Sequence, residues 1–277
     1  MSRNKLIVES SVACKVGTRS LPQSDWTAVV QHLAPQFDFV VSPLSFLEVL
    51  NSLACGDEQH VILNLKRIEA LSPVDPMRPA FLEMPGQFIL REVLKCGPVL
   101  VETYQPSQMA EAMVIVLRHR GVSAELRDWL AEIKRNHQSG TSGYVSTQDQ
   151  IRSLGQFVGN RELWLRSKTK HLGILQLTDE EVQRLSVALD AAYEYATWLR
   201  NELKNPSYSA SKEKSAWIDY QQLFYLADPS LHILYSDNDL TQRSGSSGQR
   251  SRLVKLSDVL AKATSARRCA SSSLLLA

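Results

Sequence analysis

Short apolar runs bounded by polar residues occur near both ends of the chain. Leu6-Ile7-Val8 is followed by Glu9, and the run that ends at Val41 is followed by Ser42-Pro43. Short apolar runs between polar residues are typical of buried strands. The pattern predicts strands at 5–8, 37–41, 231–235 and 253–256.

Helical spacing of apolar residues fills most of the chain between these runs. After the second strand, Ser42 is a suitable N-cap and Pro43 suits a first helical turn, so a helix is predicted through Leu53, with Gly56 just past its end. Pro85-Gly86 is expected to bend or split one later helix. The further predicted helices cover 60–71, 81–94, 108–119, 124–136, 148–170, 213–227 and 257–264.

The clearest helix signal begins at Thr178, which forms a capping box with Glu181. Apolar residues then follow at alternating spacings of three and four as far as Leu203, ahead of the Asn205-Pro206 stop. The stripe consists of Val182, Leu185, Leu189, Ala192, Ala196, Leu199 and Leu203. Because the stripe is short for a free coiled coil, packing within the chain is favoured over packing on a second chain.

The order of these elements predicts an α/β fold with a central parallel sheet, interrupted by an all-helical insertion. Strands separated by helices form parallel sheets. Residues 1–100 and 212–265 are expected to form the α/β domain, 101–211 the helical insertion, and 266–277 a flexible C-terminal tail.

Composition excludes several protein classes without selecting one. The 277 residues are 44% apolar, which is enough for a sizeable core, and 31 Lys+Arg nearly balance 29 Asp+Glu. A net charge of +2 is unlike a strongly basic nucleic-acid coat, although local clusters of charge can still bind nucleic acid. The four cysteines form no CxxC pair, which argues against zinc and disulfide scaffolds. We expect a cytoplasmic protein without a membrane span, because no apolar run is long enough to cross a bilayer.

Acidic residues stand where a parallel α/β sheet places its ligands, beyond the carboxyl ends of the strands. Glu9 follows the first predicted strand, and Asp237 follows the strand at 231–235, with Asp239 two residues later. Glu48 lies on the helix after the second strand, and Asp219 lies in a helix rich in large apolar residues. Each acid alone has an ordinary explanation as a cap, a helix-face carboxylate or a turn residue. The hypothesis of a site rests on the four together.

Converging carboxylates repel one another unless a cation neutralises them. Mg²⁺ takes oxygen ligands and keeps several waters, and such ions activate an attacking water and stabilise a phosphodiester displacement. An acidic cluster without His or Cys therefore favours phosphoryl transfer over zinc chemistry.

Four segments together resemble the PIN-like domains, a family of metal-dependent ribonucleases. The resemblance implies a three-layer PIN-like fold, an RNA substrate, and Mg²⁺ or Mn²⁺ bound by catalytic acids. It assigns the metal to Glu9, Glu48, Asp219 and Asp237, with Asp239 as an auxiliary acid and Ser236 as the small hydroxyl residue of the fourth motif. The four segments are 6–12, 40–50, 217–223 and 234–240.

Two features depart from the family pattern. Glu9 stands where the family has Asp, and the helical insertion has no counterpart in the minimal domain. A metal-dependent ribonuclease is therefore the first expectation. A catalytically impaired PIN-like module, which binds RNA or a protein partner through the insertion, is the alternative. A phosphatase-like hydrolase is disfavoured because Asp-x-Asp is missing after the first strand. A protein inhibitor and the oligomeric state are left open.

Overall fold

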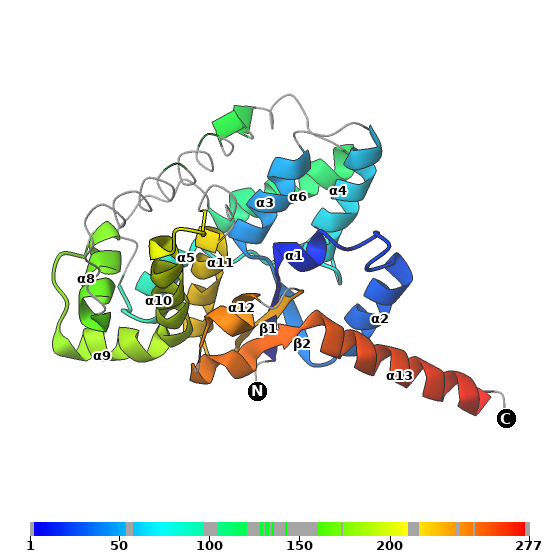
Figure 1. Ribbon diagram of the computed structural model, residues 1–277. Helices are drawn as coiled ribbons and strands as arrows, with labels where there is room; N and C mark the ends of the chain where they lie inside the picture. Colours follow the sequence, from blue (N-terminus) through cyan, green and yellow to red (C-terminus); the bar gives the residue numbers. More distant parts are fainter. Residues whose placement is uncertain are drawn as a thin grey trace.

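The structure is a computed structural model built around a four-stranded parallel sheet (Figure 1). The strands are β1 (Asn4–Val8), β2 (Phe37–Val40), β3 (Leu231–Tyr235) and β4 (Leu253–Lys255), in the order β2-β1-β3-β4. The residues described are 3–53, 58–96, 105–120, 128–129, 131–132, 135, 142, 160–172, 174–209, 216–236, 239–245 and 247–274. The predicted α/β class with a parallel sheet is confirmed, whereas the PIN-like assignment stays a prediction.

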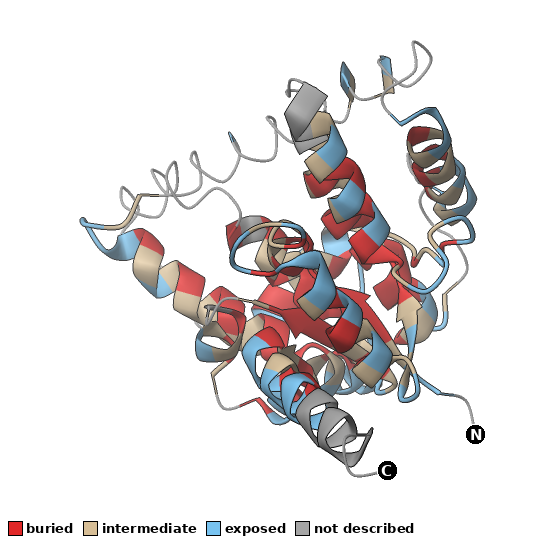
Figure 2. Cartoon of the chain, turned by 90° about the vertical axis from the view of Figure 1, so that its right-hand side faces the viewer, coloured by how far each residue is buried: buried red, intermediate tan, exposed pale blue. Residues whose placement is uncertain are grey.

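Helices cover both faces of the sheet, because the alternation of strand side chains supplies an apolar surface on each side. Leu6, Val8 and Leu234 face one cluster, and Ile7 and Ile233 face the other. The cluster on the first face takes residues from α1 (Ser10–Ala13), α2 (Gln23–Leu33), α3 (Pro43–Leu53), α4 (Glu58–Leu71), α6 (Pro106–His119) and α13 (Leu256–Leu274). Figure 2 shows the buried residues gathered on the sheet and the inward sides of these helices.

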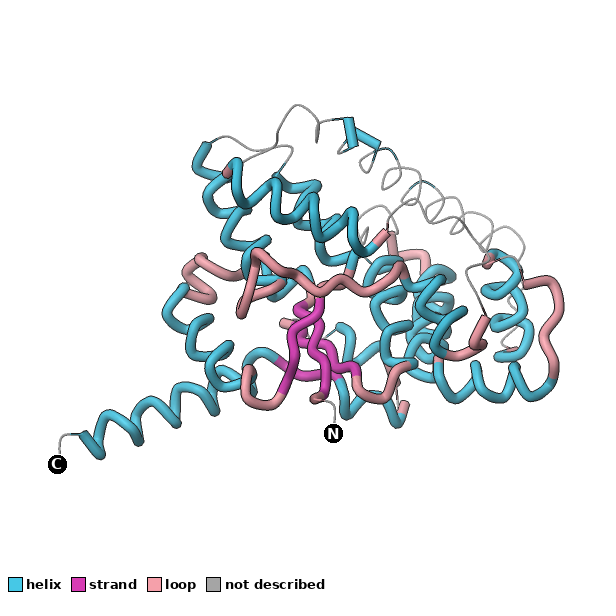
Figure 3. Tube along the Cα trace, turned by 180° about the vertical axis from the view of Figure 1, so that it is seen from behind, coloured by secondary structure: helices cyan, strands magenta, loops and turns pink. Residues whose placement is uncertain are grey.

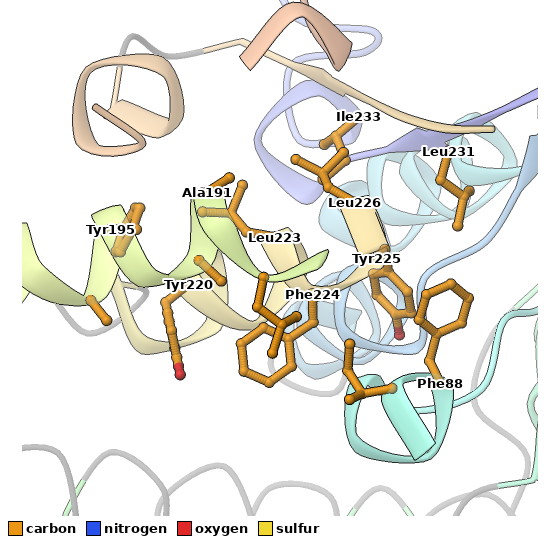
Figure 4. Close-up of a cluster of buried hydrophobic side chains, with 14 of the residues drawn as sticks. Phe88, Ala191, Tyr195, Tyr220, Leu223, Phe224, Tyr225, Leu226, Leu231 and Ile233 are labelled. Carbon is orange, nitrogen blue, oxygen red and sulfur yellow. The ribbon is translucent and has the colours of Figure 1, made fainter. Parts of the chain in front are cut away.

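The second face is covered by helices from the predicted insertion as well as from the α/β part. They are α5 (Pro85–Glu92), α8 (Arg161–His171), α9 (Asp179–Ala188), α10 (Asp190–Lys204), α11 (Ala216–Gln222) and the 3₁₀ helix η1 (Leu223–Ala227). Figure 4 shows Ala191 of α10 beside Leu223, and Tyr195 of the same helix beside Tyr220, in the cluster that reaches Ile233 of the sheet. Helices of the 101–211 segment therefore share their core with the sheet.

Most predicted elements are present, with corrections at their ends. The strands match within one residue, and α3, α4 and α6 match closely. Pro85 starts α5 rather than bending a longer helix, because a proline lacks the N–H that an interior position needs. Much of the helix predicted at 124–136, and residues 148–159 of another, lie outside the described residues.

The predicted single helix from Thr178 to Lys204 is wrong in one respect. The chain bends at Leu189, where φ is −110° and ψ is 24°, so the segment forms α9 and α10. The capping box at Thr178 is present, and the apolar stripe packs within the chain, as predicted.

The two ends of the α/β part hold further differences. The segment between β1 and β2 contains α2, which was not predicted, and α1 starts directly after Glu9. Helix α13 continues into the predicted C-terminal tail as far as Leu274, where Figure 1 shows it extending away from the body, and the flexibility of the tail stays a prediction. The remaining short elements are α12 (Asp239–Arg243) and η2 (Gly248–Arg252).

Candidate active site

The site with the most distinctive chemistry lies where the strand order reverses. The connection from β1 leads to β2 on one side of β1, and the chain then returns to β3 on its other side. Ligands of open parallel sheets bind beyond the carboxyl ends of strands at such a switch point. Figure 3 shows the central strands with helices around them. Glu9 directly follows β1 at this edge, and Ser236 directly follows β3.

Two glutamates meet at this edge through one serine hydroxyl. Ser10 Oγ lies 2.7 Å from Glu9 Oε1 and 2.5 Å from Glu48 Oε2. Glu9 is the N-cap of α1, where its side chain accepts a hydrogen bond from the Ser11 backbone N–H at 3.0 Å. The packing of α1 against α3 brings Glu48 to the same point. Thus a carboxylate following a strand and a carboxylate on a neighbouring helix become an acid pair.

The acid pair is poorly hydrated and its members repel each other. Glu9 is buried and Glu48 is partly buried. Burial, followed by the charge of Glu9, raises the pKa of Glu48 to about 7, against the lowering effect of its hydrogen bond with Ser10. A serine hydroxyl has one proton to donate, so it can serve only one of two ionised carboxylates. A proton on Glu48 would satisfy the second contact.

A second serine joins the acid pair to β3. The Ser11 hydroxyl contacts Glu9 Oε2, and Ser236 Oγ donates to Ser11 Oγ at 2.9 Å. The Glu9 backbone N–H also donates to the Leu234 carbonyl at 3.0 Å. The carboxyl ends of β1 and β3 are therefore tied by side-chain and backbone hydrogen bonds, which fix the orientation of the Glu9 carboxylate.

The structure brings together two of the four acids assigned to the metal. Asp219 lies on α11, where its charge contributes, after burial, to raising the pKa of Tyr195 on α10. Within the described ranges, no three acidic, histidine or cysteine residues are placed to hold a metal ion, so Asp219 does not join Glu9 and Glu48. Asp237 lies outside the described residues, and Asp239 begins α12 with its side chain also outside the description.

The donor atoms of the acid pair fit a hard divalent cation. Two carboxylates and nearby serine hydroxyls form an all-oxygen set, which suits Mg²⁺ or Mn²⁺ better than zinc. Mg²⁺ is commonly bound through one or two protein carboxylates, with water and substrate phosphates completing its shell. The mutual repulsion that raises the pKa of Glu48 is the electrostatic strain that a cation between the two groups would relieve.

Sequence reasoning missed the serines that organise the site. The doublet Ser10-Ser11 follows Glu9 directly, so a small polar pair after a strand was the available signal. Cys14, the C-cap of α1, also lies close to the pair. Burial raises the pKa of its thiol, Arg67 opposes the rise, and the charges of Glu48 and Glu9 add to it.

A sizeable cavity lies away from the acid pair. Its volume is about 900 Å³, and its lining includes Arg161, Arg184, Pro229, Gly248 and Arg252. Pro229 precedes β3, and Gly248 and Arg252 precede β4, so the cavity belongs to the amino edge of the sheet. The acid pair is the better candidate for chemistry because it places two carboxyls together at the carboxyl edge, where parallel sheets bind their ligands.

Comparisons with models of known families, with curated proteins and with solved structures give no match for this chain. Within the described part of the chain, no helix combines the length and apolar composition needed to cross a membrane.

Proposed function

We propose that the protein is a metal-dependent nuclease whose site is the acid pair Glu9 and Glu48. The observation that supports this most is the meeting of two carboxyls on Ser10 at the switch point, with the pKa of Glu48 raised to about 7. Perturbed carboxyl pKa values at the ligand-binding edge of a parallel sheet favour a functional site over a structural one. RNA as the substrate follows from the PIN-like resemblance alone.

Each residue of the site has a separate role in this proposal. Glu9 and Glu48 would hold Mg²⁺ or Mn²⁺, and Ser10 and Ser11 hold the carboxylates in place. A bound cation of this kind supplies Lewis-acid polarisation of a phosphate oxygen and a lowered pKa for an attacking water. Ser236, tied to Ser11, lies at the edge where a substrate phosphate would approach.

The test is cleavage of end-labelled single-stranded RNA and DNA with Mg²⁺ or Mn²⁺ and with EDTA. We expect metal-dependent cleavage by the native chain and a loss of at least about a hundredfold in Glu48→Gln, because the variant keeps the shape but removes a charge that holds the cation. Glu180→Gln is the matched control, since Glu180 is exposed in the first turn of α9. Cleavage that persists in Glu48→Gln would assign the activity to another site.

A non-catalytic binding module is the second candidate, and one observation favours it. Both oxygens of Glu9 already accept hydrogen bonds, from Ser10 and Ser11, as a purely structural N-cap would. In this case the native chain would cleave neither nucleic acid under any metal condition, and its melting temperature would not change when Mn²⁺ is added.

A further inference from the structure

An arginine lies on a helix next to the one that is capped by the first glutamate of the acid pair. Helix α1 packs on both α3, which carries Glu48, and α4, which carries Arg67. At the end of α1, burial raises the pKa of the Cys14 thiol, the charge of Arg67 lowers it, and the charges of Glu48 and Glu9 raise it further. Arg67 and the two glutamates therefore act on the same thiol from neighbouring helices, and no ion pair between Arg67 and either glutamate is found among the described residues.

Most of the hydrogen-bonding capacity of Arg67 is unused by the described residues. A guanidinium has five N–H donors in a rigid plane. Arg67 Nη1 donates to Asn64 Oδ1 at 2.8 Å, and Asn64 is a buried residue one turn earlier on α4. Arg67 Nε is buried and has no acceptor among the described residues. Arg67 Nη2 donates to no acceptor among the described residues and is not one of the buried atoms, so it is the group that an acceptor from outside can reach.

Two lysines extend the positive charge beside Arg67. Lys66 is exposed on α4, and Lys15 follows Cys14 in the turn after α1. The turn is tight at Gly17, where φ is +79°, and a Cβ there would lie 3.3 Å from Lys66 Cδ. The Lys66 stem thus lies against the turn that carries Lys15. We call Lys15, Lys66 and Arg67 the basic ledge.

We propose that the basic ledge binds a phosphate of the nucleic-acid backbone next to the acid pair, with Arg67 as its principal contact. This inference rests on the proposed nuclease function. A guanidinium matches the paired oxygens of a phosphate, and lysines add charge without demanding one geometry. Phosphate contacts of this kind position a strand without reading its sequence. The basic ledge would therefore set the position of the strand relative to Glu9 and Glu48.

The test measures binding apart from cleavage. A fluorescent single-stranded RNA is titrated with the full chain carrying Glu48→Gln, and anisotropy is recorded over a series of salt concentrations. In this background we expect Arg67→Ala to weaken binding about tenfold and to lower the slope of log K against log salt by about one. Arg67→Lys should restore the salt slope but only part of the affinity, because a lysine lacks the planar fork.

Arg250→Ala is the matched control, because Arg250 is exposed on η2 at the amino edge of the sheet. Melting curves establish that each variant is folded, and Arg67→Lys carries the test if Arg67→Ala does not fold. Binding by the Arg67 variants within twofold of the parent, or no RNA binding by the parent at low salt, overturns the inference.

The outcomes separate the inference from the proposed function. If the native chain cleaves RNA but the Arg67 variants bind RNA as the parent does, the nuclease proposal is supported and the phosphate-binding role of the basic ledge is rejected. Absent cleavage with the expected loss of binding in Arg67→Ala keeps the phosphate site and removes the nuclease.

Discussion

Two sets of polar side chains lie at opposite edges of the same sheet and differ in their charge and in their hydrogen-bond partners. They are the Gln249 amide at the amino edge and the acid pair at the carboxyl edge. At the amino edge, Gln249 Oε1 accepts from the Ala191 N–H at 3.0 Å, and its Nε2 donates to the carbonyls of Ala188 at 2.7 Å and Leu226 at 3.1 Å. One neutral amide thus joins the bend between α9 and α10 to η1. Its donors and its acceptor are all matched by backbone groups.

At the carboxyl edge, the polar groups are two carboxyls rather than one neutral amide. Ser10 lies between Glu9 and Glu48, and one hydroxyl proton cannot serve two ionised carboxylates. The fold therefore keeps two like charges close together, with burial and repulsion raising the pKa of Glu48 to about 7. An amide bonded to backbone groups of several elements indicates a structural role, whereas a carboxyl with a strongly raised pKa at the ligand-binding edge favours a functional one.

The largest expected effect on stability comes from removing the Gln249 hydrogen bonds that join the bend between α9 and α10 to η1. Gln249→Met keeps the approximate volume but removes the side-chain partner of the Ala191 N–H and of the Ala188 carbonyl, so the free energy of unfolding should fall by about 4 kcal/mol. Urea unfolding measures the change. Gln242→Met is the control, because Gln242 is exposed on α12. Equal losses in the two variants would mean that Gln249 is not the structural connection described.

The next effect is the response of the acid pair to pH in EDTA. The folded state raises the pKa of Glu48 from 4.5 to about 7, so between these values the native state binds more protons than the unfolded state. Stability should therefore fall as the pH rises through this window and then level off. A shift of this size corresponds to a loss on the order of 3 kcal/mol.

Matched variants assign that pH dependence to one residue. Glu48→Gln cannot ionise, so its stability between pH 4.5 and 7 should lack the component that Glu48 contributes. Glu180→Gln alters an exposed glutamate and should retain the native slope. An identical pH profile in Glu48→Gln and the native chain would contradict the raised pKa of Glu48.

The sheet and most of its helices follow from local patterns in the sequence. The apolar run before Glu9 and the Ser42-Pro43 pair each carry their signal within a few residues, and β1 and α3 were predicted from them. The bend at Leu189 was not predicted, because the apolar stripe continues through it without a proline or glycine. The bend is fixed by Gln249, nearly sixty residues later, whose side chain binds the backbone on both sides of it.

The site was predictable in its location but not in its membership. Glu9 and Glu48 were identified because each stands at a recognisable place relative to a strand, and they do meet. Asp219 was identified by its apolar setting, and in the structure its charge adds to the rise that burial causes in the pKa of Tyr195. Ser10 contacts both glutamates only because α1 packs against α3. This packing joins residues far apart in the sequence and cannot be read from a short segment.

The smallest expected effect compares two serines at the two ends of β3. Ser236 Oγ donates to Ser11 Oγ at 2.9 Å at the carboxyl end, and Ser230 Oγ donates to Asp228 Oδ1 at 2.8 Å at the amino end. Ser236→Ala and Ser230→Ala should each lower the free energy of unfolding by about 1 kcal/mol, because each removes one hydrogen bond. Thermal melts with increasing Mn²⁺ then separate them. Only Ser236→Ala should need more Mn²⁺ to reach the same rise in melting temperature, since only Ser236 is tied through Ser11 to Glu9. Equal Mn²⁺ dependence in both variants would confine Ser236 to the same structural role as Ser230.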